Sequence, residues 1–207
     1  MQIDFVFSIL ILIVSVIIHE VSHGYAAYYQ GDNTAKFAGR LTLNPIKHLE
    51  LFGSFVLPVI SYLTGGFIIG WAKPVPFNPY AVRYDKWGVV LVAISGPLSN
   101  LLMAVVVGLY LRFVPISGVY GQFLLQFVVV NLAFFIFNMI PFPPLDGSRV
   151  LYAIAPAPVR DVMDKIENYG IVVVFVFILF LFPLITPFIT ASVQFLLNLI
   201  VGGSVSI

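Results

Sequence analysis

The stretch FVFSILILIVSVIIHEVSHGYAAYY, residues 5–29, decides how the chain folds. Up to residue 18 its only polar side chains are Ser8 and Ser15. The apolar run extends from Ile3 to Tyr29, about 27 residues, which make roughly 40 Å of helix. Since that length is enough to cross a bilayer, we expect a transmembrane helix. Its second half carries two histidines and a glutamate, which are unusual in such a setting.

The composition places the whole chain in a membrane. The 207 residues are 60% hydrophobic and 9% charged, whereas soluble domains carry about 25% charged residues. The net charge of +1 gives no reason to expect nucleic-acid binding, and without cysteine the chain forms no disulfide. We therefore expect an integral membrane protein with a single domain, residues 1–207.

Four more apolar stretches follow the first. The stretch 51–69 contains Gly53 and Pro58 and is typical of a re-entrant segment. The last, 169–201, is interrupted by Pro183 and Pro187, which predicts either a bent span or two shorter helices. The remaining two are 87–114 and 120–140. The pattern predicts an all-α polytopic membrane protein with about four to six transmembrane helices, a re-entrant segment and a short extended or β edge segment.

The basic residues between these stretches indicate the orientation. If residues 51–69 cross fully, the ten Lys and Arg side chains divide four against six between the two sides. If these residues re-enter, the division is nine against one, which the positive-inside rule favours. The N-terminus is then outside, and the segment after the fourth stretch shares the cytoplasmic side with the end of the first helix.

The motif H-E-x-x-H is formed by His19, Glu20 and His23. Residues four apart share one helix face, so both imidazoles can bind one zinc ion while Glu20 reaches a water molecule as general base. The motif begins about 16 residues, or roughly 24 Å, into the span. Ionisable groups at such depth usually mark function, which argues against a solvated surface pattern.

A zinc hydrolase needs a third protein ligand and one open position. His48 and several acids are candidates, of which Asp146 in NMIPFPPLDGSRV, residues 138–150, is the best. Proline and glycine break the helix there, and the inferred topology brings Asp146 to the level of His23. Alone, Asp-Gly would indicate an ordinary turn. Together with the HExxH motif it predicts a metal ligand.

These two motifs resemble those of the site-2 protease family of intramembrane zinc metalloproteases, in its short form without PDZ or CBS domains. The family pattern N-x-x-P-x-P-x-L-D-G corresponds here to Asn138, Pro141, Pro143, Leu145, Asp146 and Gly147. The resemblance implies that His19, His23 and Asp146 bind one zinc ion per chain and that Glu20 is catalytic. It also implies that Asn138 contacts the substrate. An interhelical hydrogen bond is an equal alternative for Asn138.

Two further stretches resemble the short branch of the family, and a third, SGPLSN, also resembles the family. In LTLNPIKHLELFGS, residues 41–54, related chains more often read H-x-D-P-x-G, so we interpret His48 as structural or outer-shell rather than as a ligand. In GWAKPVPFNP, residues 70–79, the alternating prolines force an extended backbone, which is either an edge for strand addition to the substrate or a rigid loop. We interpret SGPLSN, residues 95–100, as a helix-packing face.

The resulting hypothesis is a zinc metalloendopeptidase that hydrolyses peptide bonds within or near transmembrane segments of membrane proteins. Its catalytic core would span about residues 3–155, followed by C-terminal helices at about 168–203. We expect a multi-pass protein of a prokaryotic plasma membrane, with the zinc nearer the cytoplasmic side. The partners would be the lipid bilayer and a transmembrane protein substrate. The alternatives are a divalent-metal transporter and a catalytically silent zinc-binding protein, although a transporter should offer further polar ligands along its spans.

Overall fold

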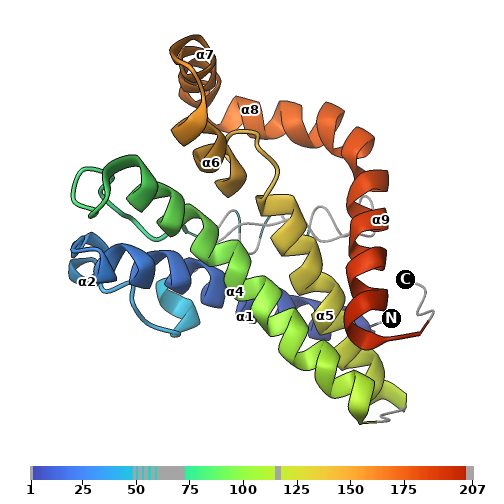
Figure 1. The fold of residues 1–207 in the computed structure, drawn as a ribbon. Coiled ribbons are helices and arrows are strands. Elements are labelled where there is room, and N and C mark those ends of the chain that lie inside the picture. Colours follow the sequence, from blue (N-terminus) through green and yellow to red (C-terminus); the bar gives the residue numbers. More distant parts are fainter. Residues whose placement is uncertain are drawn as a thin grey trace.

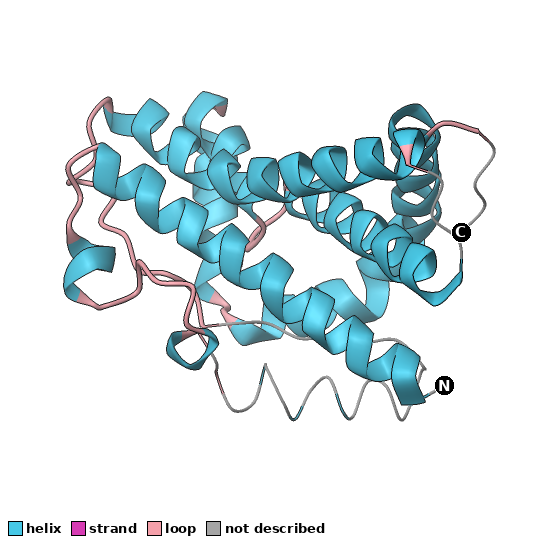
Figure 2. Cartoon of the chain, turned by 90° about the horizontal axis from the view of Figure 1, so that it is seen from below, coloured by secondary structure: helices cyan, strands magenta, loops and turns pink. Residues whose placement is uncertain are grey.

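The computed structural model describes residues 2–48, 50, 53, 56, 59, 73–114 and 118–203. This part of the chain is helical and contains no strand (Figure 2). Four of its helices are long and apolar enough to cross a membrane, which confirms the expected all-α polytopic fold. They include α1 (Gln2–Tyr29), α4 (Asp85–Phe113), α5 (Gly118–Asn138) and α9 (Phe182–Val201). The expected re-entrant stretch, residues 51–69, lies almost entirely outside the described residues.

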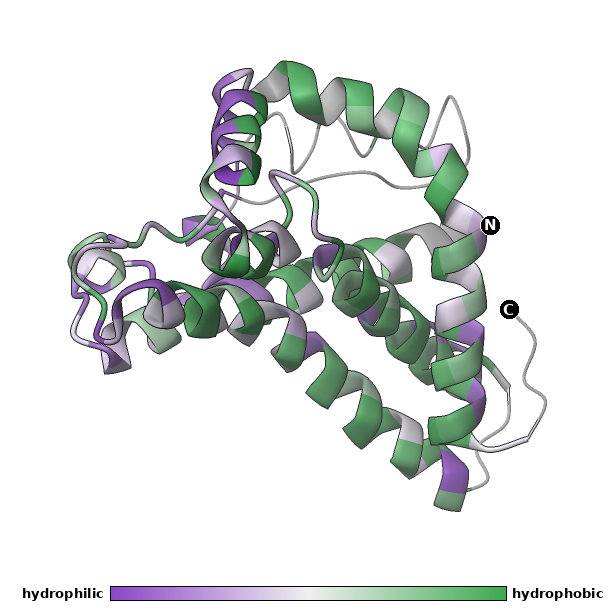
Figure 3. Cartoon of the chain, turned by 45° about the horizontal axis from the view of Figure 1, so that its top comes forward, coloured by the Kyte–Doolittle hydropathy of each residue, from purple (hydrophilic) through white to green (hydrophobic). Residues whose placement is uncertain are grey.

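Shorter elements connect the long helices. They are α2 (Thr34–Phe37), the 3-10 turn η1 (Pro45–Lys47), α6 (Asp146–Ile154), α7 (Ala157–Asn168), α8 (Ile171–Val176) and the π-helical turn η3 (Phe177–Leu181). Hydrophilic residues gather on α7 and on the loops near α2, whereas the long helices are mainly hydrophobic (Figure 3). This division agrees with long helices inside the bilayer and connections at its surfaces.

The last apolar stretch is a single helical run that bends. It passes from α8 through η3 into α9, and Figure 1 shows α8 and α9 lying at a steep angle to each other. Pro183 lies inside this run, directly after the π-helical turn, where its missing N–H and its ring interrupt the helical hydrogen bonding. The π-helical turn immediately before it is a recognised cause of sharp bends. Of the two alternatives drawn from the sequence, the bent span is the one observed.

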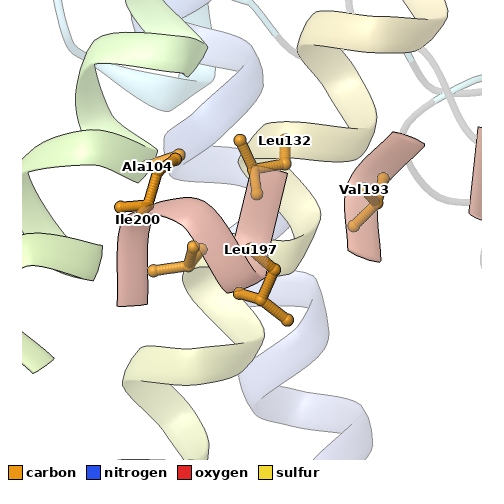
Figure 4. Packing of buried hydrophobic residues seen from close by; sticks show 6 residues of the cluster. Ala104, Leu132, Val193, Leu197 and Ile200 are labelled. Carbon is orange, nitrogen blue, oxygen red and sulfur yellow. The ribbon is translucent and has the colours of Figure 1, made fainter. Parts of the chain in front are cut away.

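Helix α4 is the centre of the bundle, since it packs against α1, α5, α6 and α9. Its second half, with α5 and α9, encloses the apolar core shown in Figure 4. That core contains Ala104, Val128, Leu132, Val193, Leu197 and Ile200. Small side chains such as Ala104 let helices approach closely, which is how they associate in a membrane.

The segment that precedes α4 returns along α1. The main-chain N–H of Arg83 donates to the carbonyl oxygen of Gln30 at 3.0 Å, and Gln30 Nε2 donates to the carbonyl oxygen of Gly88 at 3.2 Å. Residues 73–78 of this segment have no regular secondary structure. The described part of the expected extended segment 70–79 is therefore a loop and not a strand, and residues 70–72 lie outside the described residues.

Candidate metal centre

His19 and His23 lie on the face of α1 that packs against α4. Their ring centroids are 4.6 Å apart, and the two Nε2 atoms are 3.0 Å apart. The close approach follows from the spacing, because residues four apart in a helix stack one turn above the other. The two histidines that we expect to bind zinc therefore have converging imidazole nitrogens, and their role as ligands stays a prediction.

Asp146, the first residue of α6, joins this pair across the bundle. Its Oδ2 atom lies 3.1 Å from Nε2 of His19 and 3.4 Å from Nε2 of His23. The three atoms lie within 4.8 Å of one another and could hold one metal ion. Within the described part of the chain this buried Oδ2 has no hydrogen-bond donor. A buried acceptor without a donor is costly unless a cation satisfies it.

Helix α4 fixes the orientation of both imidazoles. Nδ1 of His19 lies 2.6 Å from Oδ1 of Asn100, and Nδ1 of His23 lies 2.7 Å from the carbonyl oxygen of Val92. Each ring therefore turns Nε2 toward Asp146. Such a second contact, at the nitrogen opposite the metal, is what metal-binding histidines usually have.

Gly96 of α4 leaves room at the point where the two Nε2 atoms meet. A Cβ atom at this position would lie 2.7 Å from Nε2 of His19 and closer still to Nε2 of His23. Only glycine allows the helix backbone to come this near. Two imidazole nitrogens and a carboxylate oxygen within 4.8 Å of one another therefore fit a metal ion in donor chemistry and in spacing. We interpreted SGPLSN as a packing face, and that interpretation missed the contact with the site.

A chain of buried amides continues from His19 into the bundle. Asn100 Nδ2 donates to Oδ1 of Asn131 at 2.9 Å and to the carbonyl oxygen of Ser15 at 3.3 Å. Asn131 Nδ2 donates to the carbonyl oxygen of Phe127 at 2.9 Å. Both asparagines are fully buried. These two asparagines could have been noticed in the sequence, since amide side chains within apolar spans need hydrogen-bond partners in the bundle.

Glu20 is held by the loop that runs beside α1. Its Oε2 atom accepts a hydrogen bond of 2.8 Å from the main-chain N–H of Val75. Because proline has no N–H, Val75 is the only possible main-chain donor in Pro74-Val75-Pro76. The alternating prolines therefore direct a single donor at this carboxylate.

Asp32 fastens the far end of the same loop. Its Oδ2 atom accepts a 2.6 Å bond from the N–H of Asn78, and its Oδ1 atom accepts bonds from the N–H and the hydroxyl of Thr34. Burial disfavours the charged carboxylate of Asp32, but these bonds outweigh burial and lower its pKa below the usual value. Asp32 is therefore an ionised anchor at neutral pH.

Two residues that we named from the sequence lie apart from this group. His48 is buried, its Nε2 atom lies 2.8 Å from the carbonyl oxygen of Thr42, and it does not belong to the group of converging ligand atoms. This placement agrees with a structural histidine. Asn138, the last residue of α5, donates to the carbonyl oxygen of Phe134 at 3.0 Å within its own helix. Its contact with a substrate stays a prediction.

The comparison with known proteins agrees with this site. The model of Peptidase family M50 matches residues 7–123 and 116–182. "Putative zinc metalloprotease YwhC" of Bacillus subtilis is 41% identical over 191 residues, covering 86% of this chain and 80% of that protein.

More distant relatives carry a related name, "Putative zinc metalloprotease Rip2". The protein from Mycolicibacterium smegmatis is 26% identical over 170 residues, covering 81% of this chain and 64% of that protein. The one from Mycobacterium tuberculosis is 27% identical over 194 residues, covering 90% and 71%. No solved structure matches the chain. The extent of the family match and the identity to the Bacillus protein show that the chain belongs to Peptidase family M50, the site-2 protease family that its two motifs resemble.

Proposed function

We propose that this intramembrane zinc metalloprotease holds one zinc ion through His19, His23 and Asp146 and uses Glu20 as general base. The observation that carries the proposal is the convergence of two Nε2 atoms and Asp146 Oδ2 within 4.8 Å of one another. Two imidazoles and a carboxylate are a typical ligand set of catalytic zinc, which keeps a fourth position open. The names of the relatives support the same metal.

The zinc ion and Glu20 would have different roles in peptide-bond hydrolysis. Zinc, when bound, lowers the pKa of a water molecule to about 7 and polarises the scissile carbonyl. Glu20 takes the proton of the attacking water and later passes it to the leaving amine. One oxygen of Glu20 is occupied by the N–H of Val75, which leaves the other oxygen for this proton transfer.

The proposed substrate is a transmembrane segment of another membrane protein. Such a segment hides its carbonyl groups in helical hydrogen bonds and must unwind locally before hydrolysis. Asn138, at the end of α5, is the residue that we propose for contact with the unwound backbone. This role rests on its match to the family motif.

The loop 73–79 is a poor template for strand addition. The N–H groups of Lys73, Val75 and Asn78 donate to His48, Glu20 and Asp32 of the chain itself. The three prolines of this loop have no N–H to offer. These bonds support the rigid-loop alternative, in which the loop positions Glu20 instead of pairing with the substrate.

For location, the four apolar helices support an integral membrane protein, and the bacterial relatives support the plasma membrane of a prokaryote. We propose an N-terminus outside and a metal centre nearer the cytoplasmic side, on the charge distribution of the sequence. The catalytic core would comprise about residues 3–155.

The test is co-expression with a panel of single-span proteins. The wild type should cleave at least one of them, and Glu20→Gln should abolish cleavage while zinc remains bound. Glu167→Gln is a matched control, since Glu167 is an exposed glutamate that pairs with Arg149 and is not one of the converging ligand residues. Absence of cleavage by the wild type, together with zinc uptake into liposomes that survives Glu20→Gln, would contradict the proposal and indicate a transporter.

A further inference from the structure

The two buried amides beside His19 can each be oriented in only one way, and the orientation follows from Asn131, the amide farther from His19. Asn131 Nδ2 lies 2.9 Å from the carbonyl oxygen of Phe127, which can only accept a hydrogen bond. The amide of Asn131 must therefore turn its NH₂ group toward Phe127 and its oxygen toward Asn100. The orientation of the first amide is thus fixed by the backbone of α5.

The second amide follows from the first. Asn100 has two acceptors on one side, Oδ1 of Asn131 at 2.9 Å and the carbonyl oxygen of Ser15 at 3.3 Å. Its NH₂ group donates to both, so its own oxygen must face His19. This arrangement satisfies both hydrogens of the Asn100 NH₂ group inside the bundle, where an unpaired donor would be costly.

The tautomer of His19 is the third consequence. Oδ1 of Asn100 lies 2.6 Å from Nδ1 of His19, and an amide oxygen can only accept. The proton of the neutral imidazole therefore sits on Nδ1, and the lone pair of Nε2 points at Oδ2 of Asp146, 3.1 Å away. Only this tautomer allows Nε2 to bind a metal ion.

We propose that Asn100, oriented by Asn131, is a positioning residue that holds His19 in the tautomer and ring orientation needed to bind zinc through Nε2. This inference rests on the proposed function of the centre and adds two residues that belong to neither sequence motif. His23 is held differently, because its Nδ1 faces the main-chain oxygen of Val92. The hydroxyl of Ser95 lies farther from this nitrogen, at 3.4 Å, so the short contact of His23 is to the main chain whereas that of His19 is to a side chain.

The experiment measures zinc dissociation constants of purified variants by chelator competition. Asn100→Leu removes the acceptor and should weaken zinc binding about 10- to 100-fold, the usual effect of losing such a contact. Asn131→Leu should weaken it less, because Asn100 keeps its bond to Ser15. Asn100→Asp retains an acceptor oxygen and should bind zinc more tightly than Asn100→Leu.

Gln126→Leu is the matched control. Gln126 Nε2 donates to Ser8 Oγ at 2.6 Å, so this amide also joins α5 to α1 but does not touch His19. The control should leave the zinc dissociation constant unchanged, even if it lowers thermal stability. A general loss of helix packing would affect the control and Asn100→Leu alike.

A spectroscopic readout tests the tautomer without zinc. The chain has three histidines, so ¹⁵N shifts of labelled, zinc-free protein can be assigned by single replacements. His19 should carry its proton on Nδ1 in the wild type and lose this preference in Asn100→Leu. A neutral imidazole of His19 with its proton on Nε2 in the wild type would overturn the inference.

Failure of this inference and failure of the proposed function give different results. If the wild type binds no zinc, the proposed function is wrong. If the wild type binds zinc tightly and Asn100→Leu binds it equally well, only the positioning role is wrong. Should Asn100→Leu fail to fold, Asn131→Leu decides in its place, and an unchanged zinc dissociation constant there overturns the inference.

Discussion

The two halves of α4 pack against different partners by different means. The half from Asp85 to Asn100 lies against α1 and α6. Its buried positions include Gly96, beside the imidazoles of His19 and His23, and Asn100, whose amide oxygen contacts His19. The half from Leu101 to Phe113 lies against α5 and α9, where Ala104 and Gly108 meet only apolar groups (Figures 1 and 4).

This contrast separates two uses of a small residue in a membrane helix. In the second half, glycine and alanine let helices approach, and the gain is van der Waals contact. In the first half, glycine makes room for the two imidazoles of the proposed metal centre. The same substitution in the two halves should therefore have different consequences.

Gly96→Ala should have the largest effect. The added methyl group would lie 2.7 Å from Nε2 of His19 and closer still to Nε2 of His23, so both imidazoles would have to leave the positions in which they converge. We expect zinc content and cleavage to fall by more than about 100-fold, beyond the loss usual for an outer-shell change. Elemental analysis of purified protein together with a cleavage assay measures both. Full zinc content in this variant would break the contrast between the halves.

Gly108→Ala is the matched change in the other half. Its Cβ atom would lie 2.5 Å from Cγ2 of Ile200, the methyl group of a side chain on α9. Overpacking of this kind costs about 1–3 kcal/mol, so thermal stability should fall while each folded chain still binds zinc. Ile200→Ala in the same chain removes the clashing methyl group and should recover part of the stability. Loss of zinc from folded Gly108→Ala would contradict the prediction.

Val75→Pro and Val75→Ala both remove the side chain of Val75, but only Val75→Pro also removes its main-chain N–H. Comparing them isolates the effect of this donor. Proline keeps the extended conformation but removes the N–H that binds Glu20, whereas alanine keeps the N–H. Since a hydrogen bond to a charged group contributes about 1.5–3 kcal/mol, we expect Val75→Pro to lower kcat roughly tenfold or more with zinc retained. Equal kcat values for the two variants would show that the donor does not position Glu20.

Low pH should reduce the stabilisation that the hydrogen bonds of Asp32 give to the fold. Of the predicted effects, we expect this one to be the smallest. The folded-state pKa of Asp32 lies below its usual value of 3.8, so its hydrogen bonds stabilise the fold fully above that pH. The stabilisation is then lost as the pH falls through the folded-state pKa. Asp32→Asn, whose NH₂ group would face donors, should cost about 1 kcal/mol at neutral pH. The difference in thermal stability from the wild type should shrink below about pH 4, and a difference that grows in acid would contradict this.

Part of this account could be predicted from the sequence because it depends on local spacing. The span of α1 follows from an apolar run, and the pairing of His19 with His23 follows from a separation of four residues. The proposed third ligand, Asp146, could be predicted only with a family motif and an inferred topology, and the structure brings its carboxylate within 3.4 Å of His23 Nε2.

The remaining contacts depend on how distant segments pack. Asn100 is 81 residues from His19, and Val75 is 55 residues from Glu20. No periodicity in the sequence fixes which face of α4 meets α1 or which N–H of a proline-rich loop points at a carboxylate. These are tertiary contacts, and they decide how the predicted residues are oriented.

The most direct test of the metal centre is zinc K-edge X-ray absorption of the purified protein. The account predicts one zinc ion with two imidazole ligands at about 2.0–2.1 Å and the remaining ligands oxygen. In Asp146→Ala one protein oxygen ligand should be lost and zinc should bind more weakly. Three imidazole ligands in the wild type, with a spectrum unchanged by Asp146→Ala, would make His48 the third ligand and contradict the central claim.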